Sequence, residues 1–202
     1  MILRGPRVTI RPMRREDVEA MAHWRPMADP IYQAFDLPQR SLTEHLAWFD
    51  DRVHDPTRRL FAVENEPGQV IGSLTLRDIR GTHSARLGIT LGADYVSRGY
   101  GTGALRTFLE AFFGTMGFFQ MDLDVAAINR RALRCYRSLG FREVGRHYEA
   151  AYHPSYQVLL REARYRHLRP CFRRLGAGVQ VLFYDMVLRR QEFLETAHAR
   201  LP

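Results

Sequence analysis

The sequence predicts a mixed α/β fold in which helices flank a central, mostly antiparallel β-sheet. Segments of alternating and of helical periodicity follow one another along the chain. Three strand-like segments come in a row over 60–64, 70–76 and 85–91. The 202 residues are 46% hydrophobic and 26% charged, which is enough for one compact domain over 1–202.

The N-terminal part predicts one strand and two helices. A strand over 8–12 precedes a helix over 14–24, and the proline-rich segment 25–40 is predicted to be a long loop. Ser41 and Glu44 have the spacing of a capping box, which opens a second helix. The order of the segments is then strand, helix, helix, three strands, helix, strand, helix, strand.

A glycine-rich run follows the third of the consecutive strands and leads into a helix that starts near Ala104. It consists of Arg98, Gly99, Tyr100, Gly101, Thr102 and Gly103. Glycine lets a ligand approach the backbone, and the free amides at a helix start favour an anion. Arg98 adds a positive charge with bidentate geometry. The run therefore predicts a cradle for a diphosphate.

Two familiar phosphate-binding loops do not fit this run. The dinucleotide fingerprint needs Gly-x-Gly-x-x-Gly and an acidic residue about 20 positions on, where this chain has Gln120. A P-loop ends in Gly-Lys-Ser/Thr, and this sequence contains no lysine.

A second motif comes after a predicted strand over 121–125. Asn129 is placed to cap a helix over 129–139, and Gly140 is placed to end it. The apolar residues of that helix, among them Leu133 and Tyr136, fall on one side.

Together the two motifs resemble the GNAT superfamily of N-acetyltransferases. Arg98, Gly101 and Gly103 fill its Arg/Gln-x-x-Gly-x-Gly/Ala signature, and 129–141 matches its Asn-x-x-Ala-x-x-x-Tyr-x-x-x-Gly-Phe segment. The resemblance implies a sheet splayed at the cofactor site. It also implies acetyl-CoA as cosubstrate, direct transfer of the acetyl group to an amine, and no metal.

The resemblance also implies roles for individual residues. The backbone amides of Leu87, Gly88 and Ile89 would hold the thioester carbonyl. Asn129 would contact the pantetheine arm or hold the splayed strand, although it is also explained as a helix cap alone. Tyr136 would be the general acid near the sulfur, and its alternative is a core aromatic residue.

The branch most similar to this chain is that of the ribosomal-protein N-terminal acetyltransferases. Its members often carry Glu where this chain has Arg86, so the general base is unassigned. A water relay is one substitute, and the candidate side chains are Glu44, Asp78, His83 and Asp94.

The resemblance predicts an amine-bearing acceptor, in the first place a protein or peptide N-terminus. A small amine or an antibiotic is the alternative acceptor, and a catalytically silent CoA-binding module is the alternative from another class. The candidate aromatic residues of the acceptor site are Trp24, Tyr32, Phe35 and Trp48.

Residues 150–178 form an atypical insertion before the predicted last strand. Helical spacing runs over 156–168, and Pro170 is expected to end or kink that helix. We expect a lid, a dimerisation element that would make the chain a homodimer, a contact for an acidic partner, or an amphipathic helix that covers the sheet edge.

The net charge of +8, which comes entirely from arginine, favours anionic partners. CoA is one of them, and an acidic or ribosomal partner, including RNA, is another. Arginine-rich genome composition explains the same charge without a partner. No apolar run is long enough to span a membrane, and Cys135 and Cys171 lack metal-ligand spacing. The expected location is the cytoplasm.

Overall fold

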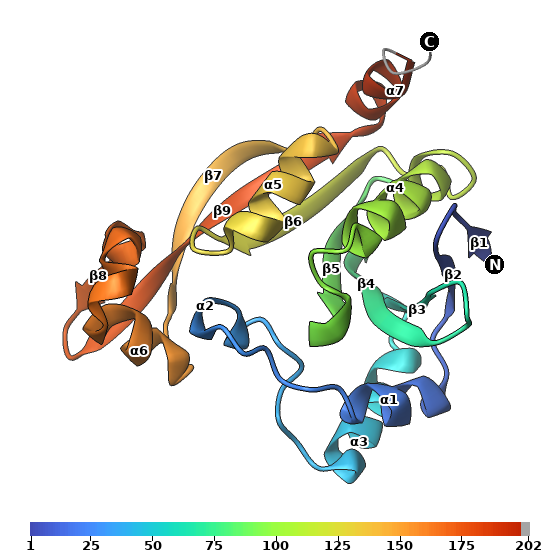
Figure 1. Cartoon of the computed structure of the whole chain (residues 1–202). Helices are drawn as coiled ribbons and strands as arrows, with labels where there is room; N and C mark the ends of the chain where they lie inside the picture. Colours follow the sequence, from blue (N-terminus) through green and yellow to red (C-terminus); the bar gives the residue numbers. More distant parts are fainter. Residues whose placement is uncertain (199–202) are drawn as a thin grey trace.

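The structure is a computed structural model that describes residues 1–198. Its sheet has the strand order β1-β2-β3-β4-β5-β6-β9-β7, with β8 paired to β9 (Figure 1). Every pairing is antiparallel except that of β5 with β6. The predicted mixed, mostly antiparallel sheet is thus confirmed. The strands are β1 Leu3–Arg4, β2 Thr9–Pro12, β3 Arg59–Glu64, β4 Val70–Arg80, β5 Ser84–Leu91, β6 Gln120–Ala126, β7 Arg142–Ala150, β8 Phe172–Leu175 and β9 Gly178–Arg189.

Helices cover both faces of the sheet. Phe61 and Val63 of β3 pack with α4 and α5, whereas Leu60, which directly precedes Phe61, packs with α1 and α3. Successive side chains of a strand point to opposite faces, so the two helix pairs lie on opposite faces. The helices are α1 Arg15–Ala22, α2 Pro30–Gln33, α3 Leu42–Val53, α4 Tyr100–Phe113, α5 Arg130–Ser138, α6 Ser155–Arg161 and α7 Arg190–His198, with 3₁₀ turns η1 Ala93–Tyr95 and η2 Ala163–Cys171.

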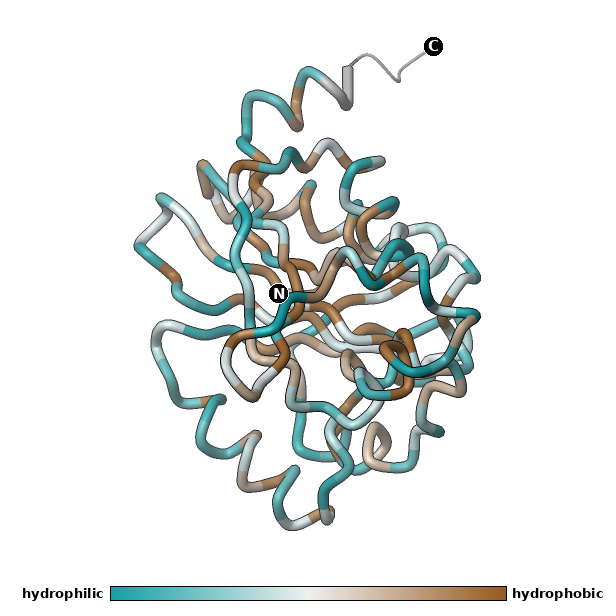
Figure 2. Tube along the Cα trace, turned by 90° about the vertical axis from the view of Figure 1, so that its left-hand side faces the viewer, coloured by the Kyte–Doolittle hydropathy of each residue, from teal (hydrophilic) through white to brown (hydrophobic). Residues whose placement is uncertain are grey.

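The hydrophobic positions gather toward the middle of the trace, and hydrophilic positions dominate its periphery (Figure 2). The largest buried cluster includes Phe108 and Phe112 of α4 together with Leu74 and Leu123 of the sheet. Burial of these side chains, at about 1.5–3 kcal/mol each, fixes α4 against β4 and β6, the two strands that flank β5.

The parallel pair β5–β6 is short. Ser84–Arg86 pairs with Gln120–Asp122, and the pairing stops there. The remaining residues of β5, 87–91, and of β6, 123–126, have no register with one another. This divergence is the splay that the family resemblance implies.

Local signals placed several helix starts correctly. Ser41 and Glu44 form the predicted capping box at α3, with the Ser41 amide donating to the Glu44 carboxylate at 2.8 Å. Asn129 caps α5, since its side-chain oxygen accepts from the Ala132 amide at 3.1 Å. The predicted loop over 25–40 contains one short helix, α2, capped by Asp29.

The helix predicted over 156–168 is wrong in part. It ends at Arg161, because Glu162 has extended backbone angles, φ −75° and ψ 134°. The 3₁₀ turn η2 follows, with Pro170 inside it rather than after it. Proline has no amide hydrogen and breaks the regular hydrogen bonding of an α-helix. The 3₁₀ turn tolerates it because this segment has no continuous α-helical hydrogen bonding to lose.

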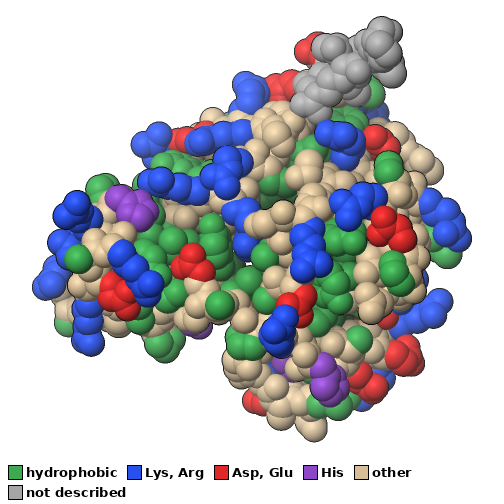
Figure 3. All heavy atoms as spheres, in the orientation of Figure 1, with side chains coloured by type: hydrophobic (Ala, Val, Ile, Leu, Met, Phe, Trp, Pro, Cys, Tyr) green, Lys and Arg blue, Asp and Glu red, His purple; other side chains and the backbone are tan. Residues whose placement is uncertain are grey.

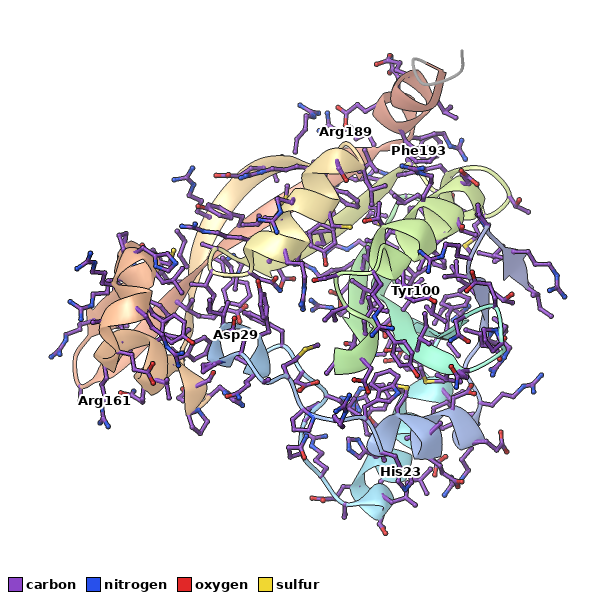
Figure 4. The ribbon with its side chains drawn as sticks, in the orientation of Figure 1. His23, Asp29, Tyr100, Arg161, Arg189 and Phe193 are labelled. Atoms are coloured by element: carbon purple, nitrogen blue, oxygen red, sulfur yellow. The ribbon has the colours of Figure 1, made fainter. Side chains whose placement is uncertain are left out.

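The segment 151–171 packs on the body of the fold. Tyr156 and Leu159 of α6 are buried in a cluster with Val181 of β9, and Ile31 of α2 packs against that cluster. At the start of α2, Asp29 accepts from the Ile31 amide at 3.0 Å. Its carboxylate also lies 3.5 Å from the hydroxyl of Tyr165 in η2 (Figure 4). The segment therefore joins α2 to the β7–β9 side of the sheet.

Candidate active site

A cavity of about 560 Å³ lies between the end of β5, the N-terminus of α4 and the helix α5. Met27 and Phe35 of the α1–α3 connection complete its wall. Figure 3, which has the orientation of Figure 1, shows a deep notch between the part with α6 and β8 and the part with α1 and α3. Arginine side chains lie at the inner end of this notch. Of the residues predicted for the cofactor, the cavity is lined by Ile89, Gly99, Gly101, Thr102 and Asn129.

The start of α4 has the features of an anion site. Gly99 occupies the N-cap with φ +85°, a left-handed conformation suited to glycine, and no side chain caps the helix. A Cβ on Gly101 would lie 3.2 Å from Cδ1 of Leu91, so glycine keeps this wall of the cavity open. The first-turn amides and the positive end of the helix dipole therefore remain available to a diphosphate.

The other members of the glycine-rich run lie outside the cavity wall. Gly103 donates its amide to the carbonyl of Gly99 at 3.0 Å. The Arg98 side chain is exposed, and its carbonyl accepts from Arg7 at 3.0 Å. The Tyr100 ring stacks under the same Arg7 guanidinium, 4.5 Å from its carbon (Figure 4). Tyr100 is thus placed against the N-terminal segment.

The two residues before Ile89 have different settings. Leu87 is buried in the core on the α4 side. Gly88 is more open: a Cβ there would meet nothing closer than 3.9 Å, at Thr75. Both follow Arg86, the last residue of β5 that pairs with β6, so their backbone borders the splay.

Sequence reasoning missed two arginines of the cavity wall, Arg131 and Arg134. The Arg131 guanidinium stacks on the ring of Tyr32 at 4.0 Å, and burial lowers its pKa. Both arginines follow the cap Asn129, and they are three residues apart, which puts them on one side of α5. This spacing is the signal by which the sequence could have indicated them.

Tyr136 is 8% exposed and lines the cavity. Burial raises the pKa of its phenol, and the nearby charge of Asp124 adds to this effect. Within residues 1–198 the phenol has no hydrogen-bond partner in the structure. Its neighbour Cys135 contacts Thr102 of α4, with 3.2 Å between Sγ and Oγ1, and burial raises the pKa of this thiol.

A carboxylate lies where the splay begins. Asp122 is the last residue of β6 that pairs with β5. Asp124 lies two positions further along the strand, so its side chain is on the same face of the sheet as that of Asp122. Its Oδ1 accepts from Arg86 at 2.7 Å and from Arg77 at 2.9 Å. The position of the family's glutamate is thus taken by an arginine that is itself ion-paired to the next strand, a contact that sequence reasoning missed.

The candidate substitutes for the base lie outside the cavity wall. Asp94 is ion-paired with Arg25, and this hydrogen bond lowers its pKa. Asp78 is exposed, 3.6 Å from the Nε of Arg86.

Glu44 is held by the Ser41 hydroxyl, which lowers its pKa. His83 lines a separate hollow beside Phe119. The four candidates are therefore engaged or placed elsewhere.

The predicted acceptor-site aromatics separate into several environments. Phe35 lines the large cavity, and Trp48 lines a smaller cavity on the other face of the sheet. Tyr32 carries the Arg131 stack, and the Trp24 ring lies where a Cβ on Gly92 would be only 3.0 Å away.

No group of three or more histidine, cysteine or acidic side chains is arranged to hold a metal ion in the part of the chain that the structure describes. Among the helices of that part, none combines the length and apolarity of a membrane span.

Comparison with known proteins decides the family. A model of the acetyltransferase (GNAT) domain matches residues 7–142. The chain belongs to the GNAT acetyltransferases. This enzyme accordingly uses acetyl-CoA as its cosubstrate, and the fold and cofactor that its two motifs predicted are confirmed.

Curated relatives of this GNAT enzyme are spermidine N(1)-acetyltransferases. That of Escherichia coli (strain K12) is 28% identical over 135 residues, which are 66% of this chain and 72% of the relative. That of Vibrio cholerae is 25% identical over 139 residues, 68% and 80% of the two chains.

Solved structures show the same fold. The Vibrio cholerae spermidine N-acetyltransferase in complex with CoA and spermine aligns with a TM-score of 0.69 and 21% identity. The alignment covers 93% of this chain and 98% of that one. These relatives favour the small-amine alternative over the peptide N-terminus that the sequence reasoning put first.

Proposed function

We propose that this GNAT enzyme transfers the acetyl group of acetyl-CoA to a primary amine of a small molecule, with polyamines as the first candidates. The observation that carries the proposal is the set of curated relatives at 25–28% identity, which are named for spermidine acetylation. Arg86 supports it as well, because a peptide N-terminal acetyltransferase would more often carry glutamate there.

The proposed CoA site follows the wall of the large cavity. The diphosphate lies at the amides of Gly101 and Thr102, where the helix dipole and the flexible Gly99 favour an anion. Arg131 and Arg134 add positive charge beside it.

The pantetheine arm runs along β5 toward the splay. Asn129 borders it, and the amides of Leu87, Gly88 and Ile89 hold the thioester carbonyl. Arg98, Tyr100 and Gly103 act through the backbone and charge of the helix start rather than through contact with the cavity.

In the proposed reaction the deprotonated amine attacks the thioester carbonyl and the C–S bond breaks. Tyr136 then gives its phenolic proton to the leaving thiolate. Burial raises the pKa of Tyr136, so the phenol is protonated at neutral pH and can act as an acid.

The test is release of CoA thiol from acetyl-CoA against a panel of spermidine, spermine, 1,4-diaminobutane, peptides with free N-termini and aminoglycosides. Turnover with the polyamines or the diamine supports the proposal. Turnover with peptides alone would overturn it, turnover with aminoglycosides alone would keep the small-molecule acceptor but reject polyamines as the substrates, and tight CoA binding without turnover on any amine would favour the silent binding module.

Further predictions concern the whole protein. One structural relative from Vibrio cholerae is dodecameric, with a TM-score of 0.64. We extend this to a homo-oligomer of the present chain, which light scattering would test. The single domain over 1–202 and the cytoplasmic location stay predictions, and a ribosomal partner has no support among the relatives.

A further inference from the structure

A second cavity, of about 150 Å³, lies on the α1–α3 face of the sheet. Its walls come from α1, α3, the segment 36–40 and the strands β4 and β5. Thr90 of β5 lines both this cavity and the large one. Both cavities therefore border β5, the strand along which the thioester is proposed to lie.

His45 is the unexplained group in this second cavity. It is 5% exposed, lies on α3 and lines the cavity wall. Its backbone amide donates to the carbonyl of Ser41 at 3.0 Å, but its imidazole has no hydrogen-bond partner within residues 1–198. Among the described residues, the fully buried side-chain nitrogen or oxygen without a partner is Nε of Arg190, so the imidazole nitrogens of His45 keep contact with the cavity and are open to a ligand or water there.

The polar groups around His45 suit an amine. Asp36 holds its carboxylate at the cavity by accepting from the amides of Met27 at 2.6 Å and Leu37 at 2.9 Å. Ser73, which is 8% exposed, turns toward the same space from β4.

The other charged groups near His45 are few. Arg40 lines the cavity from the same segment as Asp36, and Glu44 precedes His45 on α3, held by Ser41. The cavity walls from α1, β4 and β5 carry no titratable side chain: they are Val18, Met21, Ser73, Thr75 and Thr90.

The size of the cavity restricts the acceptor. Its volume of about 150 Å³ is little more than a quarter of the 560 Å³ of the large cavity. We expect an unbranched aminoalkyl arm to enter such a space more readily than an amine on a sugar ring.

We infer that this cavity receives the aminoalkyl arm of the acceptor and that His45 takes the proton that its ammonium group must lose. The inference rests on the proposed function. The proton passes to an imidazole nitrogen, directly or through one water, and the freed lone pair forms the bond to the thioester carbon. The C–S bond breaks with its electron pair going to sulfur, which takes a proton from Tyr136, and the amide nitrogen loses its second proton to water.

The first test is His45→Gln, which keeps hydrogen-bonding atoms but removes the titrating group. With 1,4-diaminobutane, kcat/KM should fall about 100-fold, as for loss of a general base. The limb of the pH profile that reports deprotonation of a histidine should vanish, and CoA affinity by calorimetry should stay unchanged. The matched control is His54→Gln at the exposed end of the same helix, where Nδ1 contacts the Asp50 carbonyl at 3.1 Å; it should behave as the wild type.

A second variant, Ser73→Leu, fills the cavity from the sheet side. It should raise the KM for 1,4-diaminobutane at least tenfold and leave the Kd for CoA unchanged, and it decides the question if His45→Gln does not fold. Wild-type kinetics in both variants would overturn the inference while the proposed function stands. Failure of the wild-type enzyme to acetylate any amine would instead overturn the proposed function.

Discussion

At the scale of single residues, Tyr136 combines two properties that a general acid needs. It reaches the cavity from α5, and it is buried enough that its pKa is raised. Asp124, whose carboxylate contributes to that rise, is held in place by Arg86 and Arg77.

The substitution Tyr136→Phe removes the phenolic proton and leaves the ring contact with Phe141, now 5.8 Å between centroids. We expect kcat to fall about 100-fold because a general acid contributes roughly that much. CoA affinity, measured by calorimetry, should change little. A variant with wild-type kcat across the pH range would show that Tyr136 is a packing residue.

Gly101 is the residue at which a side chain should matter most for the cofactor. Gly101→Glu puts a carboxylate beside the proposed diphosphate and a Cβ 3.2 Å from Leu91. We expect at least a hundredfold loss of CoA affinity in calorimetry, because the new carboxylate then repels the diphosphate of CoA at the N-terminus of α4. Arg106→Glu, which places a carboxylate on the exposed side of the same helix, serves as the control; equal losses in both variants would refute the cradle.

At the scale of elements, the paired strands β7 and β9 hold a histidine between two carboxylates. His147 of β7 lies 3.1 Å from the carboxylate of Asp185 on β9 and 3.2 Å from that of Glu149. Burial lowers the pKa of His147, but the hydrogen bonds to the two carboxylates outweigh it and the pKa is raised.

A raised pKa means that folding favours the protonated imidazole. The stabilisation is complete below the ordinary histidine pKa of about 6.5. It is lost as the pH rises through the raised value.

We therefore expect His147→Gln to lower the urea midpoint more at pH 6 than at pH 8.5. The control His23→Gln removes an exposed imidazole whose Nδ1 contacts the Glu19 carbonyl at 2.7 Å, and its effect should not depend on pH in this way. Equal losses at both pH values would show that the Asp185 contact does not favour the charged imidazole.

The α6 segment shows why elements resist prediction when their partners lie far away in sequence. Helical spacing over 156–168 was visible, but the helix stops at Arg161. Tyr165 and Leu168 are nevertheless buried with α6 residues in one cluster. The break lets both short pieces turn apolar side chains toward α2 and β9. The stabilisation comes from burial against these distant elements, so helix propensity within the segment does not predict it.

At the scale of the whole molecule, the net charge of +8 acts oppositely on the two substrates. Acetyl-CoA is an anion and a small aliphatic amine is a cation at neutral pH. Salt screens both interactions, with a Debye length of about 10 Å at 0.1 M.

Raising NaCl from about 50 to 300 mM should therefore increase the KM for acetyl-CoA and lower the KM for 1,4-diaminobutane. Steady-state kinetics in which each substrate is varied at saturation of the other would measure this. A rise in both constants would mean that local carboxylates, such as Asp36, outweigh the net charge in drawing the amine.

The fold class, the family and the cofactor could all be predicted from the amino-acid sequence. Those depend on local rules: glycines that permit a left-handed N-cap, the Asn129 cap, and the alternation of apolar residues. Such rules act within a few residues, so their signals are intact in the printed sequence.

The surroundings of the proposed reaction centre, in contrast, depend on contacts between residues far apart in the chain. Arg86 meets Asp124 across 38 residues of chain, and His45 lines one cavity with Ser73 and Thr90, which come from different elements. These contacts come from packing between elements, because burial rewards any close fit of apolar faces and polar side chains are then carried to whatever neighbours that fit provides.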